Sequence, residues 1–369
     1  RPLDYGSKFV TWAIVQTDEE KVSVRSISLI IHTASFDDFL ADQGVASYFT
    51  SVLANLERQT FKDFEFVYVD TYYDHNREAF AAAAHGLPFT VKHVPIHPNH
   101  RYWFDRGHTY ISAAKNTGIL HADGELCISC DDAEFFPDDF LETYWKHWKK
   151  KHLMLAVHKR LRTIETANGL PRAPISGDIY INDHRYARSL PPRRVSGSLA
   201  YAGTSFPLAS AIAINGYNER MDACKSLEDS EFGERLGMKG HKFINDCNGF
   251  LYIVDHPSYS TQFGELDAVK IAAAGGDGQV TQPKARPAPR KIEGKVYVEN
   301  FGMVLCVREL MEIQANRGRP SPAHMEIIQR ATIQYQHFDP LVPERAADLE
   351  IWMNTPAFDL ASERDALRR

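Results

Sequence analysis

Short apolar segments alternate with longer segments of helical spacing through the first half of the sequence, and this alternation limits the fold more than any other feature. Runs rich in branched or aromatic residues are expected to be strands: 27–31, 64–69, 89–94, 125–129 and 153–157. The segments between them place apolar residues on one helical face: 45–59, 77–84, 110–121 and 137–151. Strands separated by helices imply right-handed crossovers and a mostly parallel sheet. We therefore expect an α/β fold with a mostly parallel sheet flanked by helices.

The second half of the sequence has a weaker pattern. Residues 160–201 are rich in turn-forming and basic residues and are expected to form a loop or hairpin excursion. A helix is expected at 228–238, and strands are expected at 210–214 and 250–254. Residues 268–294 are rich in Ala, Gly, Pro and basic residues, which is typical of a linker or flexible loop.

Helical periodicity returns at 304–316 and 323–336, which predicts a small C-terminal helical extension. The expected organisation is an N-terminal extension, a main domain of two halves, a linker and the helical extension: 1–25, 26–267 (halves 26–135 and 136–267), 268–294 and 295–369.

Composition and charge exclude several classes of protein. The chain has 369 residues, 44% of them hydrophobic, which suffices for a sizeable core and excludes a disordered chain. Lys and Arg number 42 against 48 Asp and Glu. The resulting charge of -6 gives no general attraction to nucleic acids or anionic membranes, but it does not exclude a local basic groove. No apolar run reaches the roughly 18 residues of a membrane span, and no signal pattern is found at the N-terminus.

The cysteines number 5 and are scattered along the chain, which is typical of small core residues rather than a disulfide framework. We therefore expect a reducing, cytoplasmic location. Cys127 and Cys130 lie three apart on an expected strand and so point to opposite faces, which disfavours a zinc or redox pair.

Two pairs of adjacent acids are the main candidates for chemistry. Asp131 and Asp132 follow the strand expected at 125–129, and ligands of parallel sheets bind at such strand ends. Adjacent carboxylates suit a hard divalent cation that shares substrate phosphates, but a helix-capping pair is an equal alternative on position alone. Glu228 and Asp229 open the helix expected at 228–238, where the helix dipole favours acids in any case.

The order of the motifs along the chain resembles that of the family 2 glycosyltransferases. The strand end His32-Thr33 is followed by TSVLANLERQTFKDFEFVYVD, SAAKNTGILHADGELCISCDDAEFFPDDFLE, NGYNERM and LEDSEFGERL. The resemblance covers residues 26–256, and it rests on the ordered set because each motif alone is weak. It implies a GT-A, Rossmann-like fold and transfer of a sugar, with inversion, from a nucleotide-diphosphate sugar, UDP by family habit. It also implies Mn²⁺ or Mg²⁺ on the diphosphate, and a glycan or glycoconjugate as acceptor.

The resemblance also implies roles for individual residues. The nucleotide contacts would be His32, Thr33, Asp70, Lys115, Asn116 and Asp131. The metal ligands would be Asp131, Asp132 and His256. Asp229 would be the general base, preceded by Glu228. These residue types suit the reaction, because a sugar hydroxyl needs a carboxylate to take its proton and the departing diphosphate needs its charge neutralised.

The acid motif departs from the family pattern at one position. Family members carry acid, any residue, acid before the helix that starts with proline, and counting back from Pro137 puts Cys130 at the first acid position. Asp132 then matches the main metal ligand and Asp131 the middle position, so the strength of metal binding is open. His256 is equally well explained as a turn histidine.

Trp103 is a candidate platform for the sugar or acceptor, because sugars stack on aromatic rings, and the alternative is an aromatic that anchors its loop. Arg193 and Arg194 could contact a diphosphate or an anionic acceptor, and the alternative is a solvated face.

Three other functions compete with glycosyl transfer to a glycan. A modified nucleic-acid base is an alternative acceptor, and a non-catalytic nucleotide-sugar or carbohydrate-binding protein is suggested by Cys130. A nucleotidyltransferase ranks last, because no glycine-rich loop follows the first expected strand.

Overall fold

The computed structural model describes residues 25–33, 37–97, 111–181, 183, 185–217, 228–255, 290–292, 295–300, 303–305 and 359–369. The backbone alone is described for the ranges within 290–305 and for Ser198, Glu231, Glu234 and Met238. In these ranges no helix is long and apolar enough to cross a bilayer.

A five-stranded sheet with the order β12-β4-β1-β2-β3 forms the centre of the fold. Its strands are β1 (Ile27–Thr33), β2 (Phe64–Asp70), β3 (Thr90–Pro95), β4 (Leu126–Cys130) and β12 (Thr204–Pro207). The first four are parallel, and β12 joins β4 antiparallel. Every residue of β1, β2 and β4 is buried, as is typical of parallel strands covered on both faces. The expected α/β class with a mostly parallel sheet is therefore confirmed.

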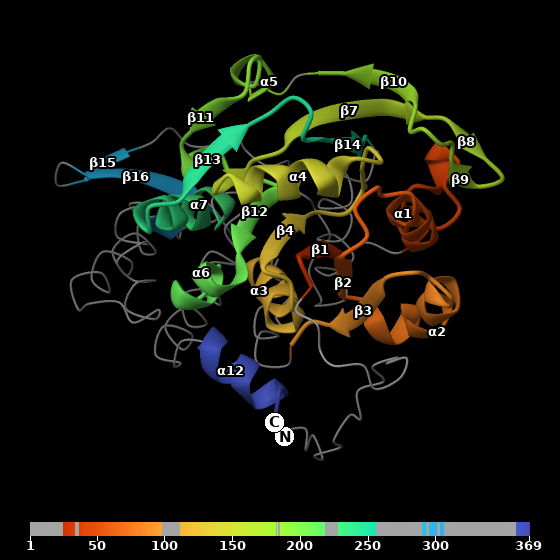
Figure 1. The fold of residues 1–369 in the computed structure, drawn as a ribbon, viewed down its shortest axis with the longest axis horizontal. Coiled ribbons are helices and arrows are strands. Elements are labelled where there is room, and N and C mark those ends of the chain that lie inside the picture. The colour runs from red at the N-terminus through yellow and green to blue at the C-terminus, as the bar shows by residue number, and fades with distance from the viewer. Residues whose placement is uncertain are drawn as a thin grey trace, which may run out of the picture.

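Helices cover both faces of this sheet (Figure 1). They are α1 (Tyr48–Glu57), α2 (Tyr73–Ala84), α3 (Ile111–His121) and α4 (Phe140–Lys149). Tyr68 of β2 stacks on Phe80 of α2, with ring centroids 5.1 Å apart. The next residue, Val69, faces Gly118 of α3, where a Cβ would overlap Ile30. Since consecutive strand residues point to opposite faces, α2 and α3 lie on opposite sides of the sheet.

Two smaller sheets complete the domain and lie at the top of the view in Figure 1. One has the order β10-β7-β14-β5 and the other the order β11-β13-β6. Their strands are β5 (Glu134–Phe135), β6 (His152–Met154), β7 (Val157–Ile164), β10 (Gly177–Tyr180), β11 (Arg193–Val195), β13 (Lys242–Asn245) and β14 (Phe250–Val254). The remaining elements around them are β8 (Thr166–Ala167), β9 (Leu170–Pro171), α5 (Arg185–Arg188), α7 (Glu228–Met238) and two 3-10 turns, η1 (Ala41–Gln43) and η3 (Gly197–Leu199). The loop or hairpin excursion expected at 160–201 thus contributes strands to both smaller sheets and contains the two-stranded sheet of β8 and β9.

Four expectations about elements were wrong. The strand expected at 153–157 is divided between β6 and the first residue of β7, which belong to the smaller sheets. Residues 210–214 belong largely to helix α6 (Leu208–Ala213) and form no strand, because a short apolar run does not distinguish the two by periodicity. Helix α4 begins at Phe140 and not at Pro137, whose carbonyl accepts the Phe140 N–H. Strands β15 (Arg290–Ile292), β16 (Lys295–Asn300) and β17 (Met303–Leu305) lie where the end of the linker and the start of the helical extension were expected.

The C-terminal helix α12 (Leu360–Leu367) packs on α3 and α6 (Figure 1). Its Leu360 N–H donates to the Asn215 side chain at 2.8 Å. The buried Arg364 donates to the carbonyls of Ile119 (2.8 Å), Leu120 (2.6 Å) and Ala122 at the end of α3. A helix end leaves its last carbonyls without internal partners, so Arg364 supplies the missing donors.

Arg364→Ala is expected to destabilise the protein by about 2–4 kcal/mol, because buried carbonyls lose their donor and each unsatisfied group costs about 1–3 kcal/mol. Urea denaturation measures this. Arg368→Ala is the control, because Arg368 is half exposed and its ion pair with Asp123 should contribute about 1 kcal/mol at most. Equal small losses in both variants would show that α12 is not needed for the stability of α3.

Candidate active site

The carboxyl ends of β1 and β4 bring the first group of predicted site residues together. Ile31 of β1 is in register with Cys130 of β4, so the residues that follow each strand meet at the same edge. Thr33 Oγ1 donates to Asp132 Oδ2 at 2.9 Å. His32 Nε2 lies 3.4 Å from Asp131 Oδ1. The strand-end residues selected from the sequence pattern therefore lie in contact with one another, and their role as a site stays a prediction.

Lys115 joins this group to the second acid pair. Its ammonium lies 2.5 Å from Asp229 Oδ1, 3.7 Å from Glu228 Oε1 and 3.9 Å from Asp131 Oδ1. The side chain is only 1% exposed. Burial lowers the pKa of Lys115, but the charges of Asp229, Asp131 and Glu228 outweigh this effect and raise the pKa well above its usual range. Lys115 is therefore a buried cation shared by two acid clusters. We call His32, Thr33, Lys115, Asp131, Asp132, Glu228 and Asp229 the Lys115 cluster.

Besides Lys115, two members of the Lys115 cluster have shifted pKa values. Burial, followed by the charge of Lys115, lowers the pKa of His32 to about 3, so this imidazole is neutral at physiological pH. Burial and the neighbouring Asp229 raise the pKa of Glu228 to about 7, although Lys115 acts in the opposite direction. Glu228 therefore exchanges its proton near neutral pH.

Helix α7 carries Glu228 and Asp229 in its first turn, and aromatic packing positions it. The Phe232 ring stacks on Tyr217 with centroids 4.0 Å apart and also meets the edge of Phe206. Arg235 donates to the carbonyls of Ile214 (2.8 Å) and Gly216 (2.7 Å). The NGY segment at 215–217 thus acts as a support for the helix that holds the second acid pair.

Asn116 holds that same segment. Its Nδ2 donates to the Tyr217 carbonyl at 2.9 Å, and its Oδ1 accepts the Tyr217 N–H at 2.7 Å. Asn215 and Gly216 have φ values of 62° and 65°, which are left-handed, and a Cβ on Gly216 would overlap the Asn116 side chain. The amide is 1% exposed and is used to support the turn, so contact between Asn116 and a diphosphate stays a prediction.

Asp70 lies at the end of β2, in register with Thr33, but its carboxylate is fully buried. It accepts the Tyr72 N–H at 2.7 Å and the Asn76 amide at 2.9 Å, and His93 Nε2 lies 2.9 Å away. These contacts fix the start of α2. A direct contact between Asp70 and a nucleotide stays a prediction.

Glu134 is a site residue that sequence reasoning missed. It is 1% exposed and its Oε2 accepts the Asp131 N–H at 3.2 Å. Burial, followed by the charge of Asp131, raises the pKa of Glu134 well above its usual range. The sequence signal that could have identified Glu134 is its position as an acid inside the apolar run AEFF. Glu134 supports the loop that presents Asp131 and Asp132.

The position of Cys130 is buried, and burial also raises the pKa of its thiol well above the usual range. It therefore stays a neutral thiol, as does the buried Cys127, in agreement with the expected core cysteines. Among the described residues, no three or more His, Cys, Asp or Glu side chains form a ready-made metal site. His256 and Trp103 lie outside the described residues.

Arg193 and Arg194 lie on β11 and are exposed. They line a hollow with α4, β6 and the turn after β13, and no member of the Lys115 cluster lines this hollow. Their role as an acceptor platform stays a prediction.

No family model matches the sequence, and a search of curated proteins finds no match. Among solved structures, S. aureus TarS has 16% identity and a TM-score of 0.39, covering 67% of this chain and 39% of that chain. S. aureus TarS 1-349 in complex with UDP-GlcNAc has 15% identity and a TM-score of 0.41, covering 67% and 66%. GalNAc-T7 with UDP, GalNAc and Mn²⁺ has 11% identity and a TM-score of 0.43, covering 64% and 45%. All these likenesses are distant, and the chain spans less than two thirds of the first structure's length.

Proposed function

We propose that the protein is an inverting glycosyltransferase that moves a sugar from a nucleotide-diphosphate sugar to an acceptor hydroxyl. The supporting observation is that Lys115 lies within 3.9 Å of both Asp131 and Asp229. This contact brings a strand-end acid pair and a helix-borne carboxylate into one site. A site of this kind combines groups that hold a diphosphate with a group that accepts a proton.

The donor set fits a divalent cation. Asp131 Oδ1 forms no hydrogen bond with the described residues, although His32 Nε2 lies 3.4 Å and the Lys115 ammonium 3.9 Å from it. Mg²⁺ commonly takes one or two carboxylates together with substrate phosphates, so Asp131 and Asp132 suffice on the protein side. His256 is the third ligand that we propose. When bound, Mn²⁺ or Mg²⁺ neutralises the charge that develops on the departing diphosphate.

The residues of the Lys115 cluster have separate roles in the proposed reaction. Asp229 accepts the proton of the acceptor hydroxyl. At the same time the hydroxyl oxygen bonds to the anomeric carbon, and the bond from that carbon to the diphosphate oxygen breaks. Lys115 orients Asp229 and adds positive charge beside the diphosphate. The neutral His32, together with Thr33, offers hydrogen bonds to the nucleoside. We propose a glycan or glycoconjugate as the acceptor.

A titration of nucleotides tests this proposal. UDP, GDP, CDP and TDP are each added with Mn²⁺, Mg²⁺ or EDTA while thermal stability and heat of binding are measured. We expect one of these nucleotides, namely UDP, to stabilise the protein only when metal is present. The expected stabilisation is about 2.7 kcal/mol at a nucleotide concentration of a hundred times Kd. The absence of any response would contradict the proposal.

Asp132→Ala is expected to weaken metal-dependent nucleotide binding at least tenfold, because even changes outside the ligand shell commonly reduce metal affinity about 10- to 100-fold. Asp138→Ala is the control, since this exposed acid near the same loop pairs with the Arg58 guanidinium and with no other charged side chain of the described residues. Calorimetry with UDP and Mn²⁺ measures both. An unchanged affinity in Asp132→Ala would remove Asp132 from the metal shell.

A non-catalytic nucleotide-sugar-binding protein is the second candidate, because the neutral Cys130 thiol stands at the first acid position. Metal-dependent nucleotide binding without transfer or hydrolysis of any donor would favour it.

A further inference from the structure

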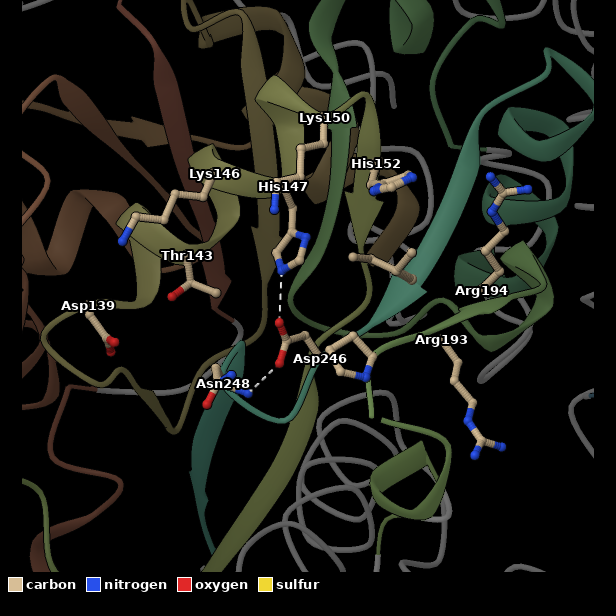
Figure 2. A pocket seen from close by; sticks show the side chains of 12 residues that line it. Asp139, Thr143, Lys146, His147, Lys150, His152, Arg193, Arg194, Asp246 and Asn248 are labelled. Atoms are coloured by element: carbon tan, nitrogen blue, oxygen red, sulfur yellow. Dashed lines mark hydrogen bonds and ion pairs between the residues drawn. The ribbon is translucent and has the colours of Figure 1, made fainter. Parts of the chain in front are cut away.

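A basic hollow lies apart from the Lys115 cluster, between α4, β6, β11 and the turn after β13 (Figure 2). Its volume is about 670 Å³. Its basic lining includes Lys150, His152, Arg193 and Arg194. Lys242 of β13 is exposed next to it, in register with His152 of β6.

Within the described part of the chain, the lining of this hollow carries more positive than negative charge, with Lys146, Lys150, Arg193 and Arg194 against Asp139 and Asp246. Lys150, Arg193, Arg194 and Lys242 are exposed, and none forms an ion pair with another described residue. The acid at the centre, Asp246, is already used. Its Oδ2 lies 2.8 Å from His147 Nε2, and its Oδ1 accepts the Asn248 N–H at 2.9 Å, as Figure 2 shows.

The pKa of His152 also reflects the positive charge of the hollow. Burial, followed by the charges of Arg194, His147, Lys242 and Lys150, lowers the pKa of His152. These four side chains come from three elements and their flanking residues, so positive groups surround the imidazole from several sides.

The shape of the lining indicates which anion fits. Guanidinium groups pair with phosphate through two parallel hydrogen bonds, and Thr143 and Asn248 add neutral polar groups. Arg193 and Arg194 are consecutive strand residues, and in Figure 2 their guanidinium groups point away from each other. One phosphate group therefore cannot use both.

Among the residues that the structure describes, no Phe, Tyr or Trp lines the hollow. Proteins that bind single-stranded nucleic acid combine basic grooves with aromatic rings on which bases stack. The lining therefore favours recognition of phosphate groups over recognition of bases.

We propose that this hollow binds a ligand with several linked phosphate groups, held by Arg193, Arg194 and Lys150. This inference does not depend on the proposed glycosyl transfer, because the hollow shares no residue with the Lys115 cluster. Attraction of this kind weakens as salt is added, since Lys150, Arg193 and Arg194 are exposed.

Calorimetry with tripolyphosphate, inorganic phosphate and a dT oligonucleotide tests the proposal on the full chain. We expect tripolyphosphate to bind at least about tenfold more tightly than phosphate, as roughly 1.4 kcal/mol from a second contact would give. The double variant Arg194→Gln with Lys150→Gln should lose this advantage. The control is Arg162→Gln, which removes an exposed arginine of β7 that pairs with Asp178 and does not line the hollow.

Equal affinity of the double variant and the native protein for tripolyphosphate would overturn the proposal. An equal loss of tripolyphosphate affinity in Arg162→Gln would also overturn it. Absence of tripolyphosphate binding to the native protein would also overturn it. Tighter binding of the oligonucleotide than of tripolyphosphate would replace the proposed ligand with a nucleic acid. The metal-dependent response to UDP should be the same in all these variants, which separates this test from that of the proposed function.

Discussion

Lys115→Met is expected to destabilise the protein by about 3–5 kcal/mol near neutral pH, because removing one partner leaves buried charge without compensation. Lys115 is 1% exposed, and the side chains of Glu228 and Asp229 are 7% and 13% exposed. Methionine keeps most of the volume, so the loss reports the charge. Urea denaturation measures the change, and the variant should also lose binding of nucleoside diphosphates.

The loss in Lys115→Met should shrink as the pH falls. Without the ammonium, which lowers the pKa of Glu228, the folded-state pKa of Glu228 rises further above its unfolded value. The folded state then binds more protons than the unfolded state, so stability increases toward low pH. In the native protein Glu228 already follows this sign, because its pKa is raised to about 7. Its cost to stability therefore appears as pH rises from its unfolded pKa toward about 7. A loss that is independent of pH would contradict the electrostatic explanation.

Lys92→Met is the matched control for Lys115→Met. Lys92 lies 2.7 Å from Glu65 and 2.6 Å from Asp123, so it also bridges two carboxylates. Its side chain is 18% exposed and lies outside the Lys115 cluster. We expect this variant to lose stability while keeping nucleotide affinity. A loss of stability below 1 kcal/mol in Lys115→Met, about the limit for an exposed pair, would show that the cluster needs no buried cation.

Asp229→Asn is expected to reduce sugar transfer roughly 100- to 10,000-fold, which is the usual contribution of a positioned general base. The amide keeps the shape of the side chain but cannot accept the proton of the acceptor hydroxyl. Lys115 retains Glu228 and Asp131 as partners, so the fold and nucleotide affinity should persist. Transfer rates with a UDP-sugar and calorimetry with UDP measure the two properties separately.

Glu228→Gln is the control for Asp229→Asn. With a pKa of about 7, Glu228 is partly protonated at neutral pH, and the neutral amide resembles that form. We expect a smaller effect on transfer than in Asp229→Asn. The reverse order, with transfer lost in Glu228→Gln and kept in Asp229→Asn, would assign the base to Glu228.

The sequence pattern was sufficient for β1, β2 and β4, because burial on both faces makes these strands readable as apolar runs, but it did not predict β12 of the same sheet. The α7 helix was predicted with its observed bounds, since its apolar face has a regular helical period. The same reasoning failed for α6, where six residues are too few to separate helix from strand. The ends of elements were predicted less well, as at Pro137, because capping depends on neighbouring structure.

The candidate site, like the fold, has features that the sequence predicts and features that only the tertiary structure shows. The sequence by itself determined that Asp131 and Asp132 follow a buried strand and that Glu228 and Asp229 open a helix, because both facts depend on local periodicity. Only the tertiary structure decided that Lys115 lies against Asp229, 114 residues away, while Asn116 turns to Tyr217. Adjacent residues on one helix diverge by about 100°, and which of them faces the site depends on the packing of α3 on the sheet. The buried Glu134 and the basic hollow were likewise decided by packing, because burial and the convergence of distant charges are properties of the folded chain.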